Sequence, residues 1–331
     1  MSADAADAVV AALRSAGRIL LVTHTHPDGD ALGSLTALRL ALEHLGRPVE
    51  VFQSTQDAVL PDELEPFRVA GALDERSVSL TGRVVVFLDC GNALRSPLGA
   101  RLAEMTTVIN IDHHHDNTGF GTVNWLDPGA SSTAEVVWEL VRRLGVPLTT
   151  DIAEALYVGL ITDTGRFSYE NTTPRAHQMA AELLAAGIDV TAIRRRLYEN
   201  IGPGKLHLLR YALDSFVLHG DGSVISARIT TKDFAAAGAT EAQSEGIIDV
   251  IRGVRGVRIA ALARELEHRP GVFKVSLRAA DPTIDVSAIA RASGGGGHPQ
   301  AAGFTTERSD AELASFLLEQ LAVQHAAIHS T

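Results

Sequence analysis

The sequence predicts an α/β protein with two domains: an N-terminal domain built on a mostly parallel sheet with helices on both faces, and a smaller C-terminal α/β domain. In the first half, runs of consecutive apolar residues alternate with segments whose leucines recur at helical spacing. This alternation is typical of parallel strands that are buried on both faces. The chain of 331 residues is also too long for one ordinary small domain, and its pattern changes after residue 212.

Four apolar runs in the first half predict strands, and five segments predict helices. The strands are expected at 18–24, 48–53, 83–89 and 107–112. The helices are expected at 7–16, 30–45, 133–144, 152–162 and 175–186. Gly46 and Gly187 follow two of these helices as stop signals, and the Ser-Ser-Thr run at 131–133 is typical of a helix N-terminus.

Residues 190–212 are interpreted as a connector, because they hold a basic run at 194–196 and a Gly-Pro-Gly breaker at 202–204. The first domain is therefore predicted at 1–189 and the second at 213–331. The elements expected in the second domain are a strand at 223–230, a helix at 244–252, a hairpin of 257–265 and 272–278, a helix at 285–292 and a closing helix at 311–326.

Composition excludes several classes of protein. Cys90 is the only cysteine, so an internal disulfide and a cysteine-rich zinc site are excluded, and we interpret it as a small buried residue. The formal net charge of −11 disfavours duplex DNA as a partner, because the phosphate contribution to binding would be repulsive. The N-terminus opens with acidic residues, and no apolar run approaches the roughly 20 residues of a membrane helix. We therefore expect a cytoplasmic protein without a membrane partner.

Polar clusters follow three of the predicted strands. The first, THTHPDGDALGS at 23–34, places His24, Asp28 and Asp30 close together, and Gly29 lets the backbone fold back. Two carboxylates this close repel each other unless a cation lies between them. A polar turn in which Asp30 caps the next helix is the simpler alternative.

Asp89 ends the strand at 83–89, and IDHHHDN at 111–117 contains His113 and His114 directly after Asp112. A strand-terminal cap and a solvated loop are the respective alternatives. Because parallel strands place their carboxyl ends at one edge of a sheet, we expect these clusters to converge. A further segment, ITDTGRFSY at 161–169, offers Asp163 at a helix end, where an ordinary turn is the alternative.

Aspartate and histidine ligands without cysteine favour Mn²⁺ over structural zinc, although Mg²⁺ and Co²⁺ accept the same ligands. Two such ions about 3.5–4 Å apart would clamp a phosphoryl group and lower the pKa of a shared water. The chain thus carries the residues of a two-metal phosphate site.

These four segments resemble the motifs of the DHH phosphoesterase superfamily, which includes RecJ-type exonucleases, family II pyrophosphatases and nano-RNase/pAp-phosphatases. GGGGHPQAAGF at 294–304 resembles the glycine-rich motif of the DHH-associated C-terminal domain. The resemblance implies a first metal on His24, Asp28 and Asp89, and a second on Asp30, Asp89, His113 and Asp163. It implies that the bridging Asp89 and the phosphate-contacting His114 are catalytic, with Asp112 supporting the ligands.

Two positions of the chain vary within that superfamily. His26 stands where the pyrophosphatases typically carry Asn, and His115 occupies a variable position. In the C-terminal domain, the resemblance implies substrate contacts by Arg278, Gly296, Gly297 and His298.

Other features of the C-terminal domain leave alternatives open. Residues 294–297 could instead form a linker, although consecutive glycine N–H groups can also form an anion-binding nest. Without the resemblance, Arg278 could be an ordinary surface arginine. Arg252, Arg255 and Arg258 recur every three residues and could line a cleft or a solvated face.

The implied activity is hydrolysis of short single-stranded RNA, of linear dinucleotides such as pApA, and of the 3′-phosphate of adenosine 3′,5′-bisphosphate. Relatives also suggest a homodimer. An inorganic pyrophosphatase or exopolyphosphatase would explain the metal motifs equally well. A nucleotide-binding sensor that uses metals only to hold a ligand is the alternative from another class.

Overall fold

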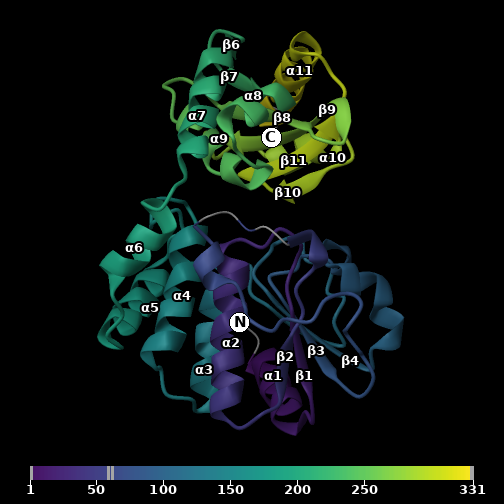
Figure 1. The fold of residues 1–331 in the computed structure, drawn as a ribbon, viewed down its shortest axis with the longest axis vertical. Coiled ribbons are helices and arrows are strands. Elements are labelled where there is room, and N and C mark those ends of the chain that lie inside the picture. Colours follow the sequence, from purple (N-terminus) through teal and green to yellow (C-terminus); the bar gives the residue numbers. More distant parts are fainter. Residues whose placement is uncertain (1–2, 58–59, 61–62, 329–331) are drawn as a thin grey trace. The chain divides into compact units, whose positions relative to one another are not determined.

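The computed structural model describes residues 3–57, 60 and 63–328 (Figure 1). The chain divides into two compact units, Met1–Asn200 and Ile201–Thr331. Residues 190–212, interpreted above as a connector, form two helices, α6 (Val190–Tyr198) and α7 (Pro203–Ser215), and the units divide between them. In the described residues, no helix combines the length and the apolar character needed to cross a membrane.

The first unit is built on a parallel five-stranded sheet in the order β2-β1-β3-β4-β5. Its strands are β1 (Ile19–Val22), β2 (Val49–Val51), β3 (Val84–Leu88), β4 (Thr107–Asp112) and β5 (Val123–Leu126). Its other α-helices are α1 (Ala3–Ser15), α2 (Gly29–His44), α3 (Thr133–Leu144), α4 (Thr150–Asp163) and α5 (Pro174–Ala185). The predicted α/β class and parallel sheet are confirmed.

Alternate residues of each strand pack into different hydrophobic cores. Ile19 and Leu21 of β1 pack with the α-helices, which gather on one side of the sheet (Figure 1). Leu20 and Val22 pack in a separate core with Leu80 and with the 3₁₀ helix η4 (Pro97–Glu104). The second face is therefore covered by loops and 3₁₀ turns, whose short segments have no helical periodicity in sequence.

The register of the sheet brings strand ends together. Val22 pairs with Phe87, and Leu88 pairs with Ile111, so the residues that follow β1, β3 and β4 share one edge. These are the polar clusters singled out in the sequence, and the expected convergence is confirmed. Cys90, the residue after Asp89, is buried and free, as expected.

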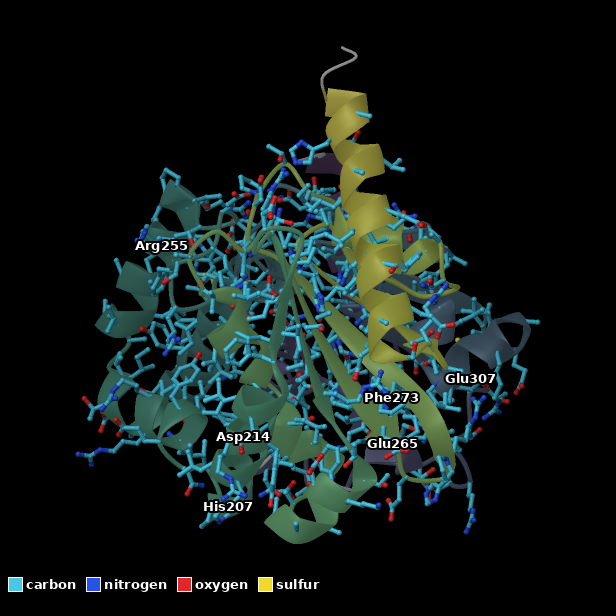
Figure 2. All side chains as sticks on the ribbon, turned by 90° about the horizontal axis from the view of Figure 1, so that it is seen from above. His207, Asp214, Arg255, Glu265, Phe273 and Glu307 are labelled. Carbon is cyan, nitrogen blue, oxygen red and sulfur yellow. The ribbon has the colours of Figure 1, made fainter. Side chains whose placement is uncertain are left out.

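The second unit is a six-stranded mixed sheet in the order β10-β11-β9-β8-β7-β6. Its strands are β6 (Val217–His219), β7 (Val224–Ile229), β8 (Ile259–Leu266), β9 (Arg269–Ala279), β10 (Gly296–His298) and β11 (Ala301–Thr306). Its helices besides α7 are α8 (Thr231–Ala237), α9 (Ile247–Arg252), α10 (Val286–Arg291) and α11 (Asp310–Ile328). The hairpin expected from the sequence is the antiparallel β8–β9 pair, in which Glu265 lies opposite Phe273 (Figure 2).

Candidate metal centre

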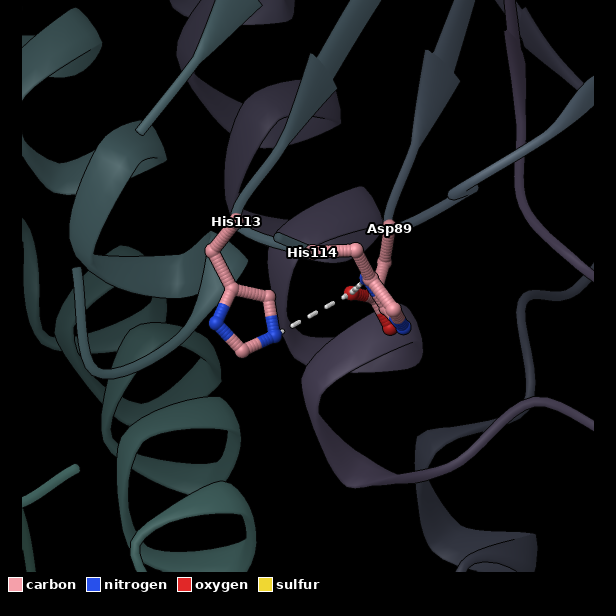
Figure 3. Close-up of side chains that lie close together, drawn as sticks. All are labelled: Asp89, His113 and His114. Atoms are coloured by element: carbon pink, nitrogen blue, oxygen red, sulfur yellow. Dashed lines mark ion pairs between the residues drawn. The ribbon is translucent and has the colours of Figure 1, made fainter. Parts of the chain in front are cut away.

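Aspartate and histidine side chains converge at the carboxyl edge of the parallel sheet. The donor atoms form three groups, and within each group they all lie within 4.8 Å of one another. The groups are His24 with Asp28 and Asp89, Asp30 with His113 and Asp163, and Asp89 with His113 and His114. The Nε2 atom of His113 lies 4.0 Å from Asp30 Oδ2, 3.8 Å from Asp89 Oδ1 and 3.5 Å from Asp163 Oδ2. Figure 3 shows the imidazoles of His113 and His114 beside the Asp89 carboxylate. The structure thus brings together all six predicted ligands, with Asp89 common to neighbouring groups.

His24 and His113 both direct their Nε2 atoms toward the carboxylates. His24 Nδ1 donates to the carbonyl oxygen of Thr25 at 2.9 Å, and His113 Nδ1 donates to that of Ala130 at 3.3 Å. Because a carbonyl can only accept, each Nδ1 carries a proton, so Nε2 is the ring atom that each histidine can offer to a metal once it holds no proton of its own. His24 Nε2 is buried 3.4 Å from Asp89 Oδ2, and it has no hydrogen-bond partner among the residues that the structure describes. A cation between these two atoms would satisfy both, so the donor set fits a metal ion.

The backbone at Asp89 is strained. Its φ of 60° lies in the left-handed region, which Asp tolerates better than most residues. Its N–H donates to Ile111 of β4 at 3.1 Å, and its carboxylate Oδ1 accepts from the Thr133 hydroxyl at 2.9 Å. Strain of this kind persists only where the surroundings fix it, which is common at functional sites.

The N-terminus of α3 orients a second carboxylate. Asp30 Oδ2 accepts from the Thr133 N–H at 2.6 Å, and Oδ1 accepts from the Ala134 N–H at 2.8 Å. The helix dipole and these N–H groups favour the ionised carboxylate. The cap of α2 is Asp28, which accepts from Ala31 N at 3.0 Å, so the alternative in which Asp30 caps this helix is wrong.

Close helix packing holds these ligands in place. At Gly33 of α2, an added Cβ would lie 2.4 Å from the carbonyl oxygen of Ala155 in α4. At Gly159 of α4, an added Cβ would lie 2.6 Å from Ala134 Cβ and 2.8 Å from Asp30 Oδ1. The two glycines therefore allow α2 to approach α4 closely enough to bury Asp30 beside the site.

His114 is held differently from the two ligand histidines. Its Nδ1 donates to Asp112 Oδ1 at 2.7 Å, and its Nε2 accepts from Arg95 Nη1 at 2.9 Å. Asp112 also accepts from the backbone N–H of His113 at 2.9 Å and from the amide of Asn117. The buried Asp112 thus fixes the neutral tautomer of His114 and supports the loop that carries both histidines.

Burial and mutual repulsion displace the pKa values of the cluster. Burial and the neighbouring Asp89 raise the pKa of Asp30 well above its usual range. Burial would also raise the pKa of Asp89, but the adjacent His24 and other imidazoles hold it well below that range. Burial lowers the pKa of His113, yet the Asp163, Asp30 and Asp89 carboxylates outweigh it and raise the pKa to about 9. Burial raises the pKa of Asp163 to about 7 against the charge of His113.

Metal binding should therefore strengthen as the pH rises. His113 and Asp163 hold protons in the metal-free protein up to a pKa of about 9 and about 7, and both must lose them to become ligands. Each proton released makes the affinity rise by up to about tenfold per pH unit. Calorimetric Mn²⁺ titrations between about pH 6 and pH 9, in buffers of different ionisation enthalpy, measure the affinity and count the protons. An affinity that stays constant over this range would contradict the assignment.

The C-terminal unit brings the four predicted substrate contacts into three consecutive rows of one sheet. Across β10, β11 and β9, His298 pairs with Ala301 and Ala301 with Arg278. In the next row Gly297 pairs with Ala302 and Ala302 with Leu277, and in the row after it Gly296 pairs with Gly303 and Gly303 with Ser276. The side chain of His298 lies outside the described part of the structure.

A hollow of about 390 Å³ opens over these strands. It is lined by Lys274, Val275, Ser276, Ser293, Gly294, Gly295, Gly296, Gly303, Phe304 and Thr305. Gly297 has φ 141°, and an added Cβ would lie 2.5 Å from the Ala301 carbonyl oxygen, so this position requires glycine. The N–H groups of Gly294 and Gly295 bond to α10 carbonyls, so the run belongs to the domain and is no linker.

The three arginines spaced by three residues do not share one partner. Arg252 Nε lies 3.7 Å from Asp249 Oδ1, and Arg258 Nε donates to Asp281 Oδ2 at 2.7 Å. Arg255 is exposed at the surface (Figure 2). Arg252 and Arg258 are thus held by separate carboxylates, which favours the alternative in which the three arginines lie on a solvated face.

Sequence reasoning missed several residues that shape the site. Arg95 and Thr133 contact His114, Asp89 and Asp30, as described above. Asn171 donates to the Ser131 carbonyl at 2.7 Å and to Asp163 Oδ2 at 3.3 Å. The Ser-Ser-Thr cap signal marked the position of Thr133, but no local signal marked Arg95 or Asn171.

Comparison with known proteins agrees with this geometry. Residues 18–160 match the DHH family, N-terminal domain, and residues 221–324 match the DHHA1 domain. The chain is 34% identical over 300 residues to the bifunctional oligoribonuclease and PAP phosphatase NrnA of Thermus thermophilus. The aligned residues cover 90% of this chain and 87% of that protein. The chain therefore belongs to the DHH family of phosphoesterases, and the resemblance seen in its motifs is confirmed.

Solved structures show the same fold. An exopolyphosphatase-related protein from Bacteroides fragilis superposes with a TM-score of 0.82 and 24% identity, covering 96% of both chains. RecJ from Thermus thermophilus, in complex with Mn²⁺, superposes with a TM-score of 0.56 and 19% identity, covering 98% of this chain and 54% of RecJ. Both likenesses establish the fold.

Proposed function

We propose that this protein hydrolyses short single-stranded RNA, linear dinucleotides such as pApA, and the 3′-phosphate of adenosine 3′,5′-bisphosphate. The observation that carries the proposal is the cluster of four carboxylates and two imidazoles in which Asp89 belongs to two neighbouring groups of donor atoms. The relationship to NrnA of Thermus thermophilus, named as an oligoribonuclease and PAP phosphatase, supports the substrate class. The hollow beside the glycine-rich strand of the C-terminal unit supports a nucleotide-sized ligand.

Two divalent ions fit the donor set. His24, Asp28 and Asp89 would hold one, and Asp30, Asp89, His113 and Asp163 would hold the other. Mn²⁺ is supported by its presence in the structurally similar RecJ, while oxygen and imidazole donors also suit Mg²⁺ and Co²⁺. When bound, such ions would neutralise charge on the phosphoryl group and lower the pKa of water.

The protein's own residues would orient the reaction. Thr133 and the N-terminus of α3 hold the Asp30 and Asp89 carboxylates in place. His114, fixed through Nδ1 by Asp112, would lie beside the scissile phosphate. Because these groups are buried and preorganised, little reorganisation is needed as charge develops on the phosphoryl group.

The test is product formation with Mn²⁺ present, comparing pApA, a 5-mer RNA, adenosine 3′,5′-bisphosphate and pyrophosphate side by side. Turnover of the nucleotides with pyrophosphate untouched is expected. Turnover of pyrophosphate alone would support the pyrophosphatase alternative and leave the metal centre standing. A Mn²⁺-loaded protein that turns over none of them would support the nucleotide-binding sensor.

Replacing Arg278 with Ala should raise KM for a short RNA by about tenfold or more with little change in kcat. Arg278 is half-buried on β9, and a charge-assisted hydrogen bond to phosphate contributes about 1.5–3 kcal/mol to binding. Steady-state kinetics measures both constants. The exposed Arg269, on the same strand, provides the control variant Arg269→Ala. An unchanged KM in Arg278→Ala would remove Arg278 from the substrate contacts.

A further inference from the structure

Arg95 is a half-buried cation at the candidate metal centre, and none of the described carboxylates forms an ion pair with it. It ends the short 3₁₀ helix η3 (Ala93–Arg95), and its Nη1 lies 2.9 Å from His114 Nε2. In the part of the chain that the structure describes, its guanidinium forms no ion pair. Buried or half-buried arginines elsewhere do: Arg83 pairs with Glu50, and Arg264 with Glu245. Among the described residues, Arg95 thus lacks the direct ion pair that a partly buried charge usually has.

The backbone at Arg95 is anchored to the loop that carries the metal ligands. Its carbonyl oxygen accepts from the N–H of Thr25 at 2.9 Å and from the Thr25 hydroxyl at 3.1 Å. On the other side, η4 packs so closely that a Cβ at Gly99 would overlap the Ala93 carbonyl oxygen. The turn thus fixes the backbone of Arg95, from which its side chain extends, next to the segment that carries His24.

His114 holds the guanidinium without neutralising it. Its Nδ1 proton is directed to Asp112, so His114 is a neutral acceptor toward Arg95. A guanidinium has five N–H donors, and this contact uses one of them. Asp112 accepts its hydrogen bonds from neutral donors, namely the His113 N–H, the His114 ring and the Asn117 amide. Most of the hydrogen-bonding capacity of Arg95 therefore remains for an anion.

The charge balance of the centre leaves a role for the Arg95 cation. The four ligand carboxylates, Asp28, Asp30, Asp89 and Asp163, would balance two divalent ions. A phosphate that enters this neutral cluster brings uncompensated negative charge, which a planar guanidinium matches well.

We propose that Arg95 is a phosphate-binding catalytic residue, whose guanidinium donates to a non-bridging oxygen of the scissile phosphate while His114 holds it in place. This inference rests on the proposed function. It adds Arg95, a residue of the protein itself, to the groups that contact the negatively charged phosphate of the substrate. The competing interpretation is that Arg95 only positions His114. The proposal requires the positive charge of Arg95 for phosphate binding, whereas the competing interpretation requires only an N–H donor toward His114.

The variant Arg95→Gln separates them, because glutamine can still donate to His114 but carries no charge. Affinity for inorganic phosphate is measured by calorimetry on the Mn²⁺-loaded protein, with kcat/KM for a 5-mer RNA alongside. We expect Arg95→Gln to bind phosphate at least about tenfold more weakly and to lose about 100-fold in kcat/KM. Arg95→Lys, which keeps the charge, should lose less in both.

Two controls secure the comparison. Arg101→Gln makes the same chemical change in η4, at an arginine that pairs with Glu104, and should leave phosphate affinity unchanged. Thermal unfolding and Mn²⁺ stoichiometry of each variant identify any loss of the fold or of the metals, and Arg95→Lys serves if the Gln variant does not fold.

Wild-type phosphate affinity in Arg95→Gln would overturn the proposal and leave a positioning role. A wild-type protein that binds no inorganic phosphate would overturn it as well. If phosphate binding depends on the charge at residue 95 but no phosphoester is hydrolysed, the anion site stands and the proposed function fails.

Discussion

Replacing Asp89 with Asn should lower kcat by more than about 10²-fold, because loss of a supporting group alone costs about 10–100-fold and Asp89 is itself shared between donor groups. Asn has the shape of Asp and also tolerates the left-handed backbone seen at this position. The Thr133 hydroxyl can still donate to its oxygen. The change therefore removes a charge from the centre while leaving the local fold intact.

Steady-state kinetics and Mn²⁺ stoichiometry of the Asp89→Asn variant check this expectation. Asp116→Asn makes the same chemical change at an exposed residue of the histidine loop and should leave both quantities unchanged. More than a tenth of wild-type activity in Asp89→Asn would show that Asp89 does not bridge two ions.

Replacing Gly159 with Ala should destabilise the first unit and weaken metal binding together. Ala in place of Gly inside a helix normally stabilises a protein by about 0.5–1 kcal/mol. Here the new methyl group would lie 2.6 Å from Ala134 Cβ and 2.8 Å from Asp30 Oδ1. Overpacking of this kind costs about 1–3 kcal/mol, and relief of the clash must shift Ala134 and the Asp30 carboxylate from their present positions.

Thermal unfolding and a Mn²⁺ titration of Gly159→Ala measure the two effects. We expect a lower melting temperature and loss of the ion that Asp30 would hold. Gly17→Ala is the control, since an added Cβ there meets nothing within 4 Å. A Gly159→Ala protein with wild-type stability and two bound ions would mean that Asp30 does not occupy its described position.

The positions of the residues in the candidate metal centre could be predicted from sequence because their signal is local. His24, Asp89 and His113 each follow an apolar strand, and parallel strands bring such positions to one edge. Asp163 was recognised as a polar residue at the end of a long apolar helix. The neighbouring residues and the rule for strand ends marked these positions, and the resemblance to the DHH motifs assigned them to two metals.

The residues that orient the ligands could not be predicted, because their contacts span the chain. Thr133 reaches Asp30 across 103 positions and Asp89 across 44. Arg95 lies in a 3₁₀ turn of three residues, whose sequence resembles any surface loop. Gly159 reads in sequence as a weak point of a helix, and only the packing of α2 on α4 explains it. Likewise β5 is only four residues long, and two of them are polar or aromatic.

The central claim is a centre for two metal ions, and a Mn²⁺ titration of chelator-treated protein tests it most directly. Electron paramagnetic resonance of free Mn²⁺ counts the ions that each chain removes from solution at a pH near 8, above the pKa of about 7 of Asp163. The account predicts two ions per chain in the wild type and fewer than two in Asp89→Asn. A wild-type protein that binds one ion, or none, would contradict it.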